Sequence, residues 1–471
     1  MCGIAGVLGD VGRSAAVERT RVLIAAQAHR GPDHWATTAD SLEIPGALGY
    51  CRLAIVGIGG VGNQPIVSPS GRFVLVFNGE IYNYRELSST YHLGIPPSDG
   101  HVIAALWELK GSSCLQLLRG MFAVAVYDTT EANLTLARDR YGIKPLYLRW
   151  TASSVEFASD VRTIGAGCSL GPAAVATFLS LGALPADQSP FDGVDSLAPG
   201  HLRTFGFVDG RFRAQAAVRF VDDEAPSRQD VDGGFRQVLL DSVRAHLVAD
   251  VEVAHLMSAG VDSSLIAYAA RELGVSLRCI TVDTGPDCDE VRGARRLSSH
   301  FGHSLEVVTS EVSESGLEAF FGAMQRPSID GLNTFVVTEA VRRAGFKVAL
   351  SGLGGDEAMA GYGHARLLKL LRARQHEPAR LVARAVASVG KHVGRVGAKQ
   401  AKFLTDPELV NAWLLCRLQR QVLGDDVVSR LVGTAASVPA VDPPDQMEHG
   451  LDLFAWAQAE RHLYLQSTLL P

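Results

Sequence analysis

The chain has 471 residues, of which 47% are hydrophobic and 20% are charged, and its 44 basic and 50 acidic side chains give a net charge of −6. This composition excludes a disordered chain and predicts two or three folded domains. A mildly acidic chain gains no long-range attraction to nucleic acid or anionic membrane, and no apolar run approaches the roughly 20 residues that span a bilayer, so we expect neither partner.

Short β-rich runs separated by Gly, Asp and Pro turns dominate about the first 220 residues and predict antiparallel sheets. An amphipathic stretch at 17–28 predicts a helix among them. The polar, acidic segment 221–232 is typical of a linker. The predicted strands lie at 72–77, 121–128, 134–138 and 145–150.

After the linker, strands and helices alternate, which predicts a parallel α/β sheet. Beyond residue 361 the pattern is mostly helical, and residues 365–403 contain ten Lys or Arg and a single acid. Because the net charge is negative, this basic stretch favours a solvated helical face over an RNA or membrane surface. The predicted strands of this half lie at 251–257, 277–282, 305–308 and 348–350.

The seven cysteines are scattered, without the spacing of a zinc site or a disulfide framework. The first residues lack the basic start and long apolar run of a secretion signal. Both features predict a cytoplasmic protein with reduced thiols.

Cys2 follows Met1, and removal of Met1 would give this residue both a thiol and a free α-amine. An α-amine, with a pKa of roughly 7.7–8.0, can serve as the general base for its own thiol. Further motifs follow in order: CGIAG at 2–6, RGPD at 30–33, RLAI at 52–55, QP at 64–65, NGEIYN at 78–83, GMFA at 120–123 and RDRYGIKPLY at 138–147.

This ordered set resembles the class II glutamine amidotransferases, an N-terminal-nucleophile family, and implies an α+β αββα sandwich with Cys2 as nucleophile. The resemblance makes the Asn78 side chain and the Gly79 backbone the donors to the oxyanion. Arg52 can fork onto the α-carboxylate of glutamine, and Glu80 and Asp99 can hold its α-ammonium. The segment 98–101 reads SDGH, with a histidine where the family usually has a glutamate.

Residues 258–264 read SAGVDSS and lie between a predicted strand and a predicted helix. Small residues before a helix N-terminus let backbone N–H groups surround an anion. The run resembles the SGGxDSS pyrophosphate loop of the ATP-pyrophosphatase fold, with Ala259 at a family glycine, and it lacks the ending of a P-loop. The resemblance assigns ATP binding to Ser258, Gly260, Asp262, Ser263 and Ser264.

A second loop, SGLGGDE at 351–357, follows the fourth strand of the predicted parallel sheet. Its strand end falls on the same sheet edge as the first loop, where ligands of open α/β folds bind. Asp262 and Asp356 could therefore share Mg²⁺ with the phosphates of ATP. We further expect Ser351 and Gly352 to contact ATP and Glu357 to lie with Asp356 at the acyl-adenylate, and the resemblance places Leu256 and Val282 at the adenine.

Together these motifs resemble the glutamine-hydrolysing asparagine synthetases. The resemblance implies a glutaminase domain over 2–220, a linker over 221–232, and over 233–471 an α/β adenine-nucleotide α-hydrolase-like (ATP-pyrophosphatase) domain with a helical C-terminal part. It also implies that ammonia from glutamine attacks an acyl-adenylate of aspartate, that ATP and Mg²⁺ are required, and that the protein can form a homodimer.

Two other functions remain open from the sequence. The loops predict adenylation but not the acceptor, so a relative that amidates or cyclises a natural-product or peptide carboxylate fits as well. A glutaminase-only or regulatory protein is the third reading. The family usually continues past a segment like that ending at Pro471 with a basic, aspartate-containing stretch, so the resemblance predicts a C-terminally shortened synthetase domain with weak activity.

Overall fold

The computed structural model describes residues 2–9, 11–39, 42–221, 234–283, 285, 288–309, 313–359, 361, 412–432 and 453–469. The chain divides into two compact units. The first unit comprises Met1–Ser169, Asp187–Gln325 and Leu332–Gly352, and the second comprises Leu170–Ala186, Arg326–Gly331 and Leu353–Pro471.

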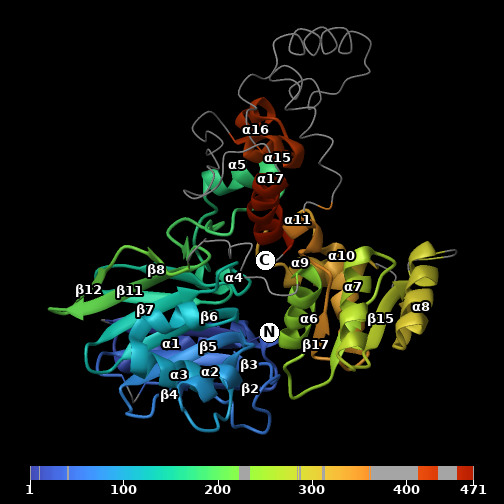
Figure 1. Cartoon of the computed structure of the whole chain (residues 1–471). Coiled ribbons are helices and arrows are strands. Elements are labelled where there is room, and N and C mark those ends of the chain that lie inside the picture. Colours follow the sequence, from blue (N-terminus) through green and yellow to red (C-terminus); the bar gives the residue numbers. More distant parts are fainter. Residues whose placement is uncertain are drawn as a thin grey trace. The chain divides into compact units, whose positions relative to one another are not determined.

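The first unit contains two antiparallel sheets and one parallel sheet (Figure 1). Its described strands are β1 (Gly3–Gly9), β2 (His34–Thr38), β3 (Gly46–Arg52), β4 (Ile66–Val67), β5 (Phe73–Ile81), β6 (Gly120–Asp128), β7 (Asn133–Arg138), β8 (Tyr147–Trp150), β9 (Ser154–Ala158), β10 (Asp195–Ser196), β11 (His201–Val208), β12 (Arg211–Ala214), β13 (Val218–Arg219), β14 (Val253–Leu256), β15 (Arg278–Asp283), β16 (Ser304–Thr309) and β17 (Val348–Leu350).

The described helices of the first unit lie on either side of these sheets or connect their strands. They are α1 (Arg13–Ala26), η1 (Ala28–Arg30), α2 (Tyr84–Thr90), α3 (Asp99–Lys110), η2 (Gly111–Leu117), α4 (Val161–Ile164), α6 (Gly234–His246), α7 (Val261–Glu272), α8 (Asp289–Phe301), α9 (Glu314–Ala323) and α10 (Leu332–Arg343).

Two antiparallel sheets, with strand orders β10-β8-β9-β1-β3-β2 and β12-β11-β7-β6-β5-β4, share one apolar core, and β13 pairs with β11. Successive side chains of a strand point to opposite faces. In β1, Ile4 and Leu8 enter this shared core, whereas Ala5 and Val7 pack against α1 through residues such as Leu23. Every residue of β1 is therefore buried, and the strand that follows Cys2 is fixed on both faces.

The second antiparallel sheet is covered on its outer face by α3, whose Val102, Ile103 and Leu106 pack with Leu75 and Phe77 of β5. The order helix, sheet, sheet, helix is the predicted αββα sandwich, and this prediction is confirmed. The predicted strand at 72–77 proves to be longer, since β5 runs to Ile81 and carries the NGEI residues within a paired strand.

The parallel sheet has the order β16-β15-β14-β17, and each of its pairs is parallel as predicted. Its apolar face residues pack against α7 and α8 on one side, through Ala267 and Ala294, and against α10 on the other, through Ala340. The helical pattern expected between the third and fourth strands is interrupted after α9, in a segment that contains Pro327, which cannot donate a helical N–H.

The described part of the second unit is helical, as the sequence predicts for its C-terminal residues. Trp413, Cys416, Trp456 and Leu463 form its apolar core. Its described elements are α5 (Pro172–Leu181), α11 (Gly355–Met359), α15 (Ala412–Arg420), α16 (Asp425–Val432), α17 (Leu453–Glu460) and the π-helical η3 (Arg461–Leu469).

Helix α5 belongs to this second unit although it falls within the range 2–220 that the sequence assigns to the glutaminase. The backbone N–H of Val422 donates to the carbonyl of Ser180 over 2.6 Å, and that of Ile329 donates to Gly182 over 2.9 Å. The predicted domain limits stay predictions. Residues 222–232 of the predicted linker and the basic stretch 365–403 lie outside the described residues.

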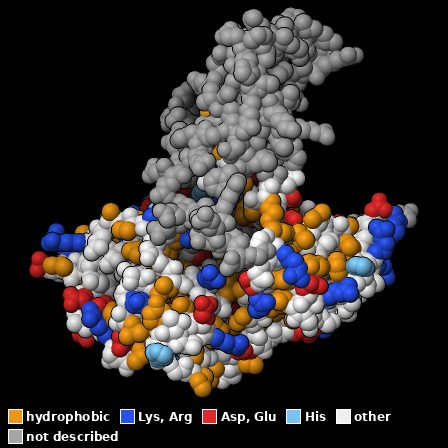
Figure 2. All heavy atoms as spheres, in the orientation of Figure 1, with side chains coloured by type: hydrophobic (Ala, Val, Ile, Leu, Met, Phe, Trp, Pro, Cys, Tyr) orange, Lys and Arg blue, Asp and Glu red, His pale blue; other side chains and the backbone are white. Residues whose placement is uncertain are grey.

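Among the helices that the structure describes, none combines the length and the hydropathy that crossing a bilayer requires. On the face shown in Figure 2, acidic and basic side chains are interspersed over the described surface.

Candidate active sites

Cys2 immediately precedes β1, which lies between β3 and β9 in the first antiparallel sheet. Its thiol lies 3.7 Å from the carbonyl oxygen of Leu53, and its own carbonyl oxygen accepts a hydrogen bond of 3.0 Å from Nε of Arg30. Burial raises the pKa of the Cys2 thiol. A thiol held in its protonated form needs a base before it can attack, which suits the expected role of the α-amine.

A pocket of about 330 Å³, counted with its space open to solvent, lies beside Cys2. Of the residues predicted to bind glutamine, Arg52, Glu80 and Asp99 line this pocket, together with the predicted catalytic residues Cys2 and Gly79. The remaining lining residues are Leu53, Ile55, Val56, Gly62, Gln64, Ile66, Phe77, Ser98 and Gly100.

Arg52 ends β3 and is held from behind by a tight loop. Its Nη2 donates to the carbonyls of Val56 and Gly57 over 2.8 and 2.7 Å, and its Nη1 donates to Oδ1 of Asn63 over 3.0 Å. A guanidinium has further N–H donors beyond these three bonds, which leaves donors for a ligand carboxylate. The loop therefore fixes the guanidinium in place before any ligand binds.

Glu80 and Asp99 lie close enough to influence each other. Burial and the charge of Asp99 raise the pKa of Glu80 to about 8. Burial also raises the pKa of Asp99 to about 6, although the N–H groups of Ile81 and Gly100 donate to its carboxylate. The cations of Lys144 and Arg52 oppose the rise in the pKa of Glu80 but do not cancel it, so the empty pair holds a proton, and a bound ammonium would take that proton's place.

This pair predicts a pH dependence for glutamine binding. Because both pKa values are raised, lowering the pH from about 8 to about 6 protonates the empty pair, and binding must then displace a proton. We expect affinity to weaken by up to about tenfold per pH unit across this window. Calorimetric titration of the Cys2→Ala protein in buffers of different ionisation enthalpy measures both the affinity and the released proton.

Glutaramate, which lacks the α-ammonium but keeps the carboxylate and the amide, is the matched control. Its affinity is expected to show no such decline, because it has no cation to compete with the proton. Proton release with glutaramate equal to that with glutamine would contradict the assignment of the carboxylate pair.

Asn78 and Gly79 occupy neighbouring positions of β5 but differ in their surroundings. Asn78 is fully buried, its Nδ2 lies 3.5 Å from Oγ of Ser159, and its Oδ1 has no hydrogen-bond partner within the described structure. Asn78 is not among the residues that line the pocket, so its contact with an oxyanion stays a prediction. A Cβ on Gly79 would lie 2.1 Å from the carbonyl oxygen of Met121, so β5 needs glycine there to pair with β6.

Two motif residues have positioning roles that the sequence analysis did not assign. The side-chain amide of Gln64 forms two hydrogen bonds with the backbone of Phe77, the residue of β5 that precedes Asn78. Its Nε2 donates to the carbonyl of Phe77 over 2.8 Å, and its Oε1 accepts from the N–H of Phe77 over 2.6 Å. Asp139 accepts N–H groups of Phe122 and Lys144 and so ties the RDRYGIKPLY turn to β6. The motifs QP and RDRYGIKPLY were the signals that could have found them.

Lys144 is a third such residue, and it is buried near Cys2 and Glu80. Burial lowers the pKa of Lys144, Arg30 adds to this effect, and Glu80 opposes it. The Lys144 charge in turn favours ionisation of the Cys2 thiol.

The predicted pyrophosphate loop lies between β14 and α7 in the first unit. Its hydroxyls are bonded within the loop: Oγ of Ser263 lies 2.8 Å from Oγ of Ser258, and Oγ of Ser264 donates to the carbonyl of Gly260 over 2.6 Å. Leu256 and Val282, predicted at the adenine, are half-buried at the ends of β14 and β15.

The second loop approaches the first at Gly352. A Cβ there would lie 2.9 Å from Cβ of Asp262 and 3.0 Å from the backbone nitrogen of Ser263. Below both loops, the ring of buried His255 contacts the carbonyls of Leu350 and Ser263 at 3.3 and 2.9 Å. The structure therefore places Ser351 and Gly352 beside the start of α7, at one edge of the sheet.

Asp356 and Glu357, predicted at the acyl-adenylate, belong to the second unit, so their position near Asp262 stays a prediction. Asp356 is half-buried and Glu357 is 1% exposed, which differs from the solvated start of a helix. Among the described residues, no three His, Cys, Asp or Glu side chains cluster as metal ligands, and the Mg²⁺ site likewise stays a prediction.

Ala259, which stands at a family glycine, is accommodated by a second glycine. A Cβ on Gly293 of α8 would lie 2.5 Å from Cβ of Ala259, and Ala259 itself has no positive φ. Gly293 thus supplies the room that the alanine needs.

We expect Gly293→Ala to lower the free energy of unfolding by about 1–3 kcal/mol, because the added methyl overlaps Ala259. Adding Ala259→Gly to this variant should restore most of the loss in urea titrations. Gly322→Ala is the control, since a Cβ there meets nothing within 4 Å. A double variant no more stable than Gly293→Ala would show that the two residues do not share this space.

Comparison with known families decides the class of the chain. Residues 1–213 match the sequence model described as a glutamine amidotransferase domain, and residues 234–460 match the one described as asparagine synthase. The chain belongs to the family that joins these two domains.

Three relatives in this family illustrate its range. Amidase chry2 of Gibberella zeae is 29% identical over 408 residues, covering 77% of this chain and 59% of its own length. Asparagine synthetase 2 of Oryza sativa is 30% identical, and the match covers 77% of this chain and 60% of that protein. Asparagine synthetase B of Escherichia coli is 29% identical, and the match covers 77% of this chain and 65% of that protein. The chain thus spans 59–65% of the length of these relatives.

Proposed function

We propose that the chain hydrolyses glutamine at Cys2 and delivers the ammonia to a carboxylate that ATP has activated. The observation that supports this most is the pocket beside the Cys2 thiol, which holds a fixed guanidinium on Arg52 and a carboxylate pair on Glu80 and Asp99. These groups complement the α-carboxylate and α-ammonium of one amino acid, and they leave its side chain for the thiol.

In the first reaction the α-amine of Cys2 takes the thiol proton, and the sulfur attacks the amide carbon of glutamine. The amide nitrogen then leaves as ammonia, and water cleaves the thioester to give glutamate and the free thiol. Gly79 N–H and the Asn78 side chain are the proposed donors to the oxyanion in both halves. In this proposal the glutaminase comprises residues 2–220.

In the second reaction, assigned to residues 233–471, a carboxylate oxygen of the acceptor attacks the α-phosphorus of ATP and pyrophosphate leaves. Ammonia then attacks the acyl carbon and AMP leaves, which gives the amide. The loops at 258–264 and 351–357 are the proposed phosphate contacts, because their N–H groups and hydroxyls suit an anion. Asp262 and Asp356 would hold Mg²⁺, a hard cation that balances phosphate charge.

Aspartate is the proposed acceptor, since two of the three relatives named above are asparagine synthetases. The likeness to a protein named as an amidase favours a second candidate, a relative that amidates or cyclises a different, natural-product or peptide carboxylate. A glutaminase-only or regulatory protein is the third. A cytoplasmic location and a homodimer complete the proposal.

One paired assay separates these functions. Glutamate and pyrophosphate release are measured together with ATP and Mg²⁺ present, first with aspartate and then with a panel of other carboxylic acids. Pyrophosphate release that needs aspartate supports asparagine synthesis, and release that needs another acid supports the second candidate. Glutamate release with no pyrophosphate from any acid would overturn the synthetase half of the proposal.

A further inference from the structure

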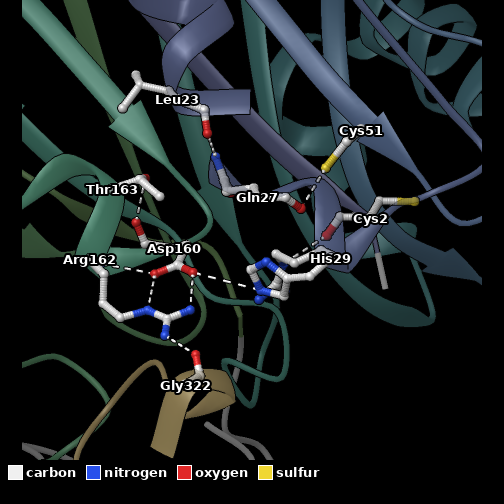
Figure 3. A network of polar contacts seen from close by, with 10 residues as sticks. Cys2, Leu23, Gln27, His29, Cys51, Asp160, Arg162, Thr163 and Gly322 are labelled. Carbon is white, nitrogen blue, oxygen red and sulfur yellow. Dashed lines mark hydrogen bonds and ion pairs between the residues drawn. The ribbon is translucent and has the colours of Figure 1, made fainter. Parts of the chain in front are cut away.

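Asp160 is a fully buried carboxylate between β9 and α4, and it is not among the residues that line the glutaminase pocket (Figure 3). Arg162 encloses it: its backbone N–H and its Nε donate to Oδ1 over 2.9 and 3.2 Å, and its Nη2 donates to Oδ2 over 2.8 Å. Nε2 of His29 lies 3.9 Å from the same carboxylate. Arg162 thus compensates the charge of Asp160, whereas burial lowers the pKa of His29 and disfavours its charged form.

The residues next to this carboxylate contact the reacting part of the glutaminase site. Ser159 accepts the N–H of Ile4 over 3.0 Å and lies 3.5 Å from Nδ2 of Asn78. Arg30, which follows His29, donates to the carbonyl of Cys2 over 3.0 Å. The network around Asp160 therefore positions the nucleophile and the proposed oxyanion donor.

The residues proposed to bind the α-carboxylate and the α-ammonium of glutamine are held in place by other parts of the chain. The 56–63 loop holds Arg52, and the N–H groups of Ile81 and Gly100 hold Asp99. Within the described structure, neither side chain is hydrogen-bonded to Asp160 or Arg162. A displacement of Asp160 should consequently alter the chemistry more than the binding of glutamine.

Arg162 also reaches away from the pocket. Its Nη1 donates to the carbonyl of Gly322, in the last turn of α9, as the dashed line in Figure 3 shows. The last carbonyls of a helix lack intrahelical partners, and a cation there is favoured by the helix dipole. Helix α9 lies in the part of the chain that matches asparagine synthase, and its Phe320 packs against Phe335 of α10 with ring centroids 5.7 Å apart.

We propose that Arg162 is a positioning residue for glutamine hydrolysis, through which helix α9 of the asparagine synthase domain holds Cys2 and Asn78 in their reactive arrangement. One guanidinium bonds to both Asp160 and Gly322, so a shift of α9 is transmitted to the carboxylate and from there to Ser159 and Arg30. This inference rests on the proposed glutaminase function and adds a link by which the second domain controls it.

The test is Arg162→Lys, which keeps a cation beside Asp160 but cannot bond in the same forked way to Asp160 and Gly322 at once. We expect kcat for glutamine hydrolysis to fall about tenfold, while KM stays within about twofold. Rates are normalised to the sites labelled by the glutamine analogue 6-diazo-5-oxo-norleucine, so that loss of folded protein does not count as loss of kcat.

Arg19→Lys is the matched control, because Arg19 forms a forked pair with Glu156 of β9 and contacts no residue of α9 in the described structure. Both kinetic constants should stay unchanged in it. An unchanged kcat in Arg162→Lys, a rise in KM alone, or an equal loss in Arg19→Lys would overturn the proposal.

The link is tested from its other end by Phe320→Ala, which removes the ring contact between α9 and α10 and substitutes no residue of the glutaminase domain. Its kcat should fall in the same direction, and this variant serves also where Arg162→Lys is unstable. An unchanged kcat in Phe320→Ala refutes the role of α9. A wild-type chain that hydrolyses no glutamine, or a Cys2→Ala variant that still does, refutes the glutaminase function instead.

Discussion

Cys2→Ala is expected to abolish glutamine hydrolysis, with a loss of at least about 10³-fold in kcat, because no thiolate is left to form the thioester. Amide formation from free ammonia should survive, since the variant leaves the loops at 258–264 and 351–357 unchanged. The measurement is glutamate release with glutamine, and pyrophosphate release with ammonium chloride as the nitrogen source.

Cys51→Ala is the matched control for this substitution. Cys51 lies in β3 beside the nucleophile strand, its thiol donates to the carbonyl of Gln27 over 3.2 Å, and burial raises its pKa to about 11. It does not line the pocket, so its loss should leave hydrolysis intact. The α-amine mechanism also requires that active protein lack Met1, and full activity in protein whose mass retains Met1 would contradict it.

Asp262→Asn is expected to lower pyrophosphate release by at least about a hundredfold while glutamine hydrolysis continues. The variant removes a negative charge at the start of α7, where Gly352 brings the second loop against the first. If this carboxylate holds the cation that balances the phosphates, the leaving pyrophosphate loses that compensation in the transition state. Both products are followed in the same reaction mixture.

The control is Asp241→Asn, which changes the net charge equally on the exposed face of α6, where Asp241 pairs with Arg244. Its pyrophosphate release should match that of the wild-type chain. Release at the wild-type rate from Asp262→Asn would refute the assignment of this carboxylate, whereas loss of glutamine hydrolysis as well would indicate a wider disturbance of the first unit.

The features that the sequence predicted correctly are those that depend on a local pattern of residues. The alternation of strands and helices after residue 250 gives the parallel sheet, and the position of SAGVDSS after an apolar strand places it at the N-terminus of α7. The residues around the glutamine pocket were found by motif, and the structure brings Arg52, Glu80 and Asp99 to one cavity because the β3, β5 and α3 segments that carry them converge there.

What the sequence did not predict depends on pairing between distant segments. Ser159 contacts Ile4 and Asn78, which are 155 and 81 residues away, and no periodicity in the chain encodes such contacts. The requirement for glycine at 79 arises from the neighbouring strand β6, which only the sheet register reveals. The helix predicted at 17–28 instead runs from Arg13 to Ala26, since its start has no side-chain cap to mark it.

The membership of α5 in the second unit has a consequence for dividing the chain. A cut anywhere in 222–233 would leave α5 on one fragment and its partners Val422 and Ile329 on the other, although two backbone hydrogen bonds join them. The C-terminal fragment alone would expose the apolar surface that Leu181 covers. The second unit thus takes its segments from both sides of such a cut, so a C-terminal fragment would lack one of its helices.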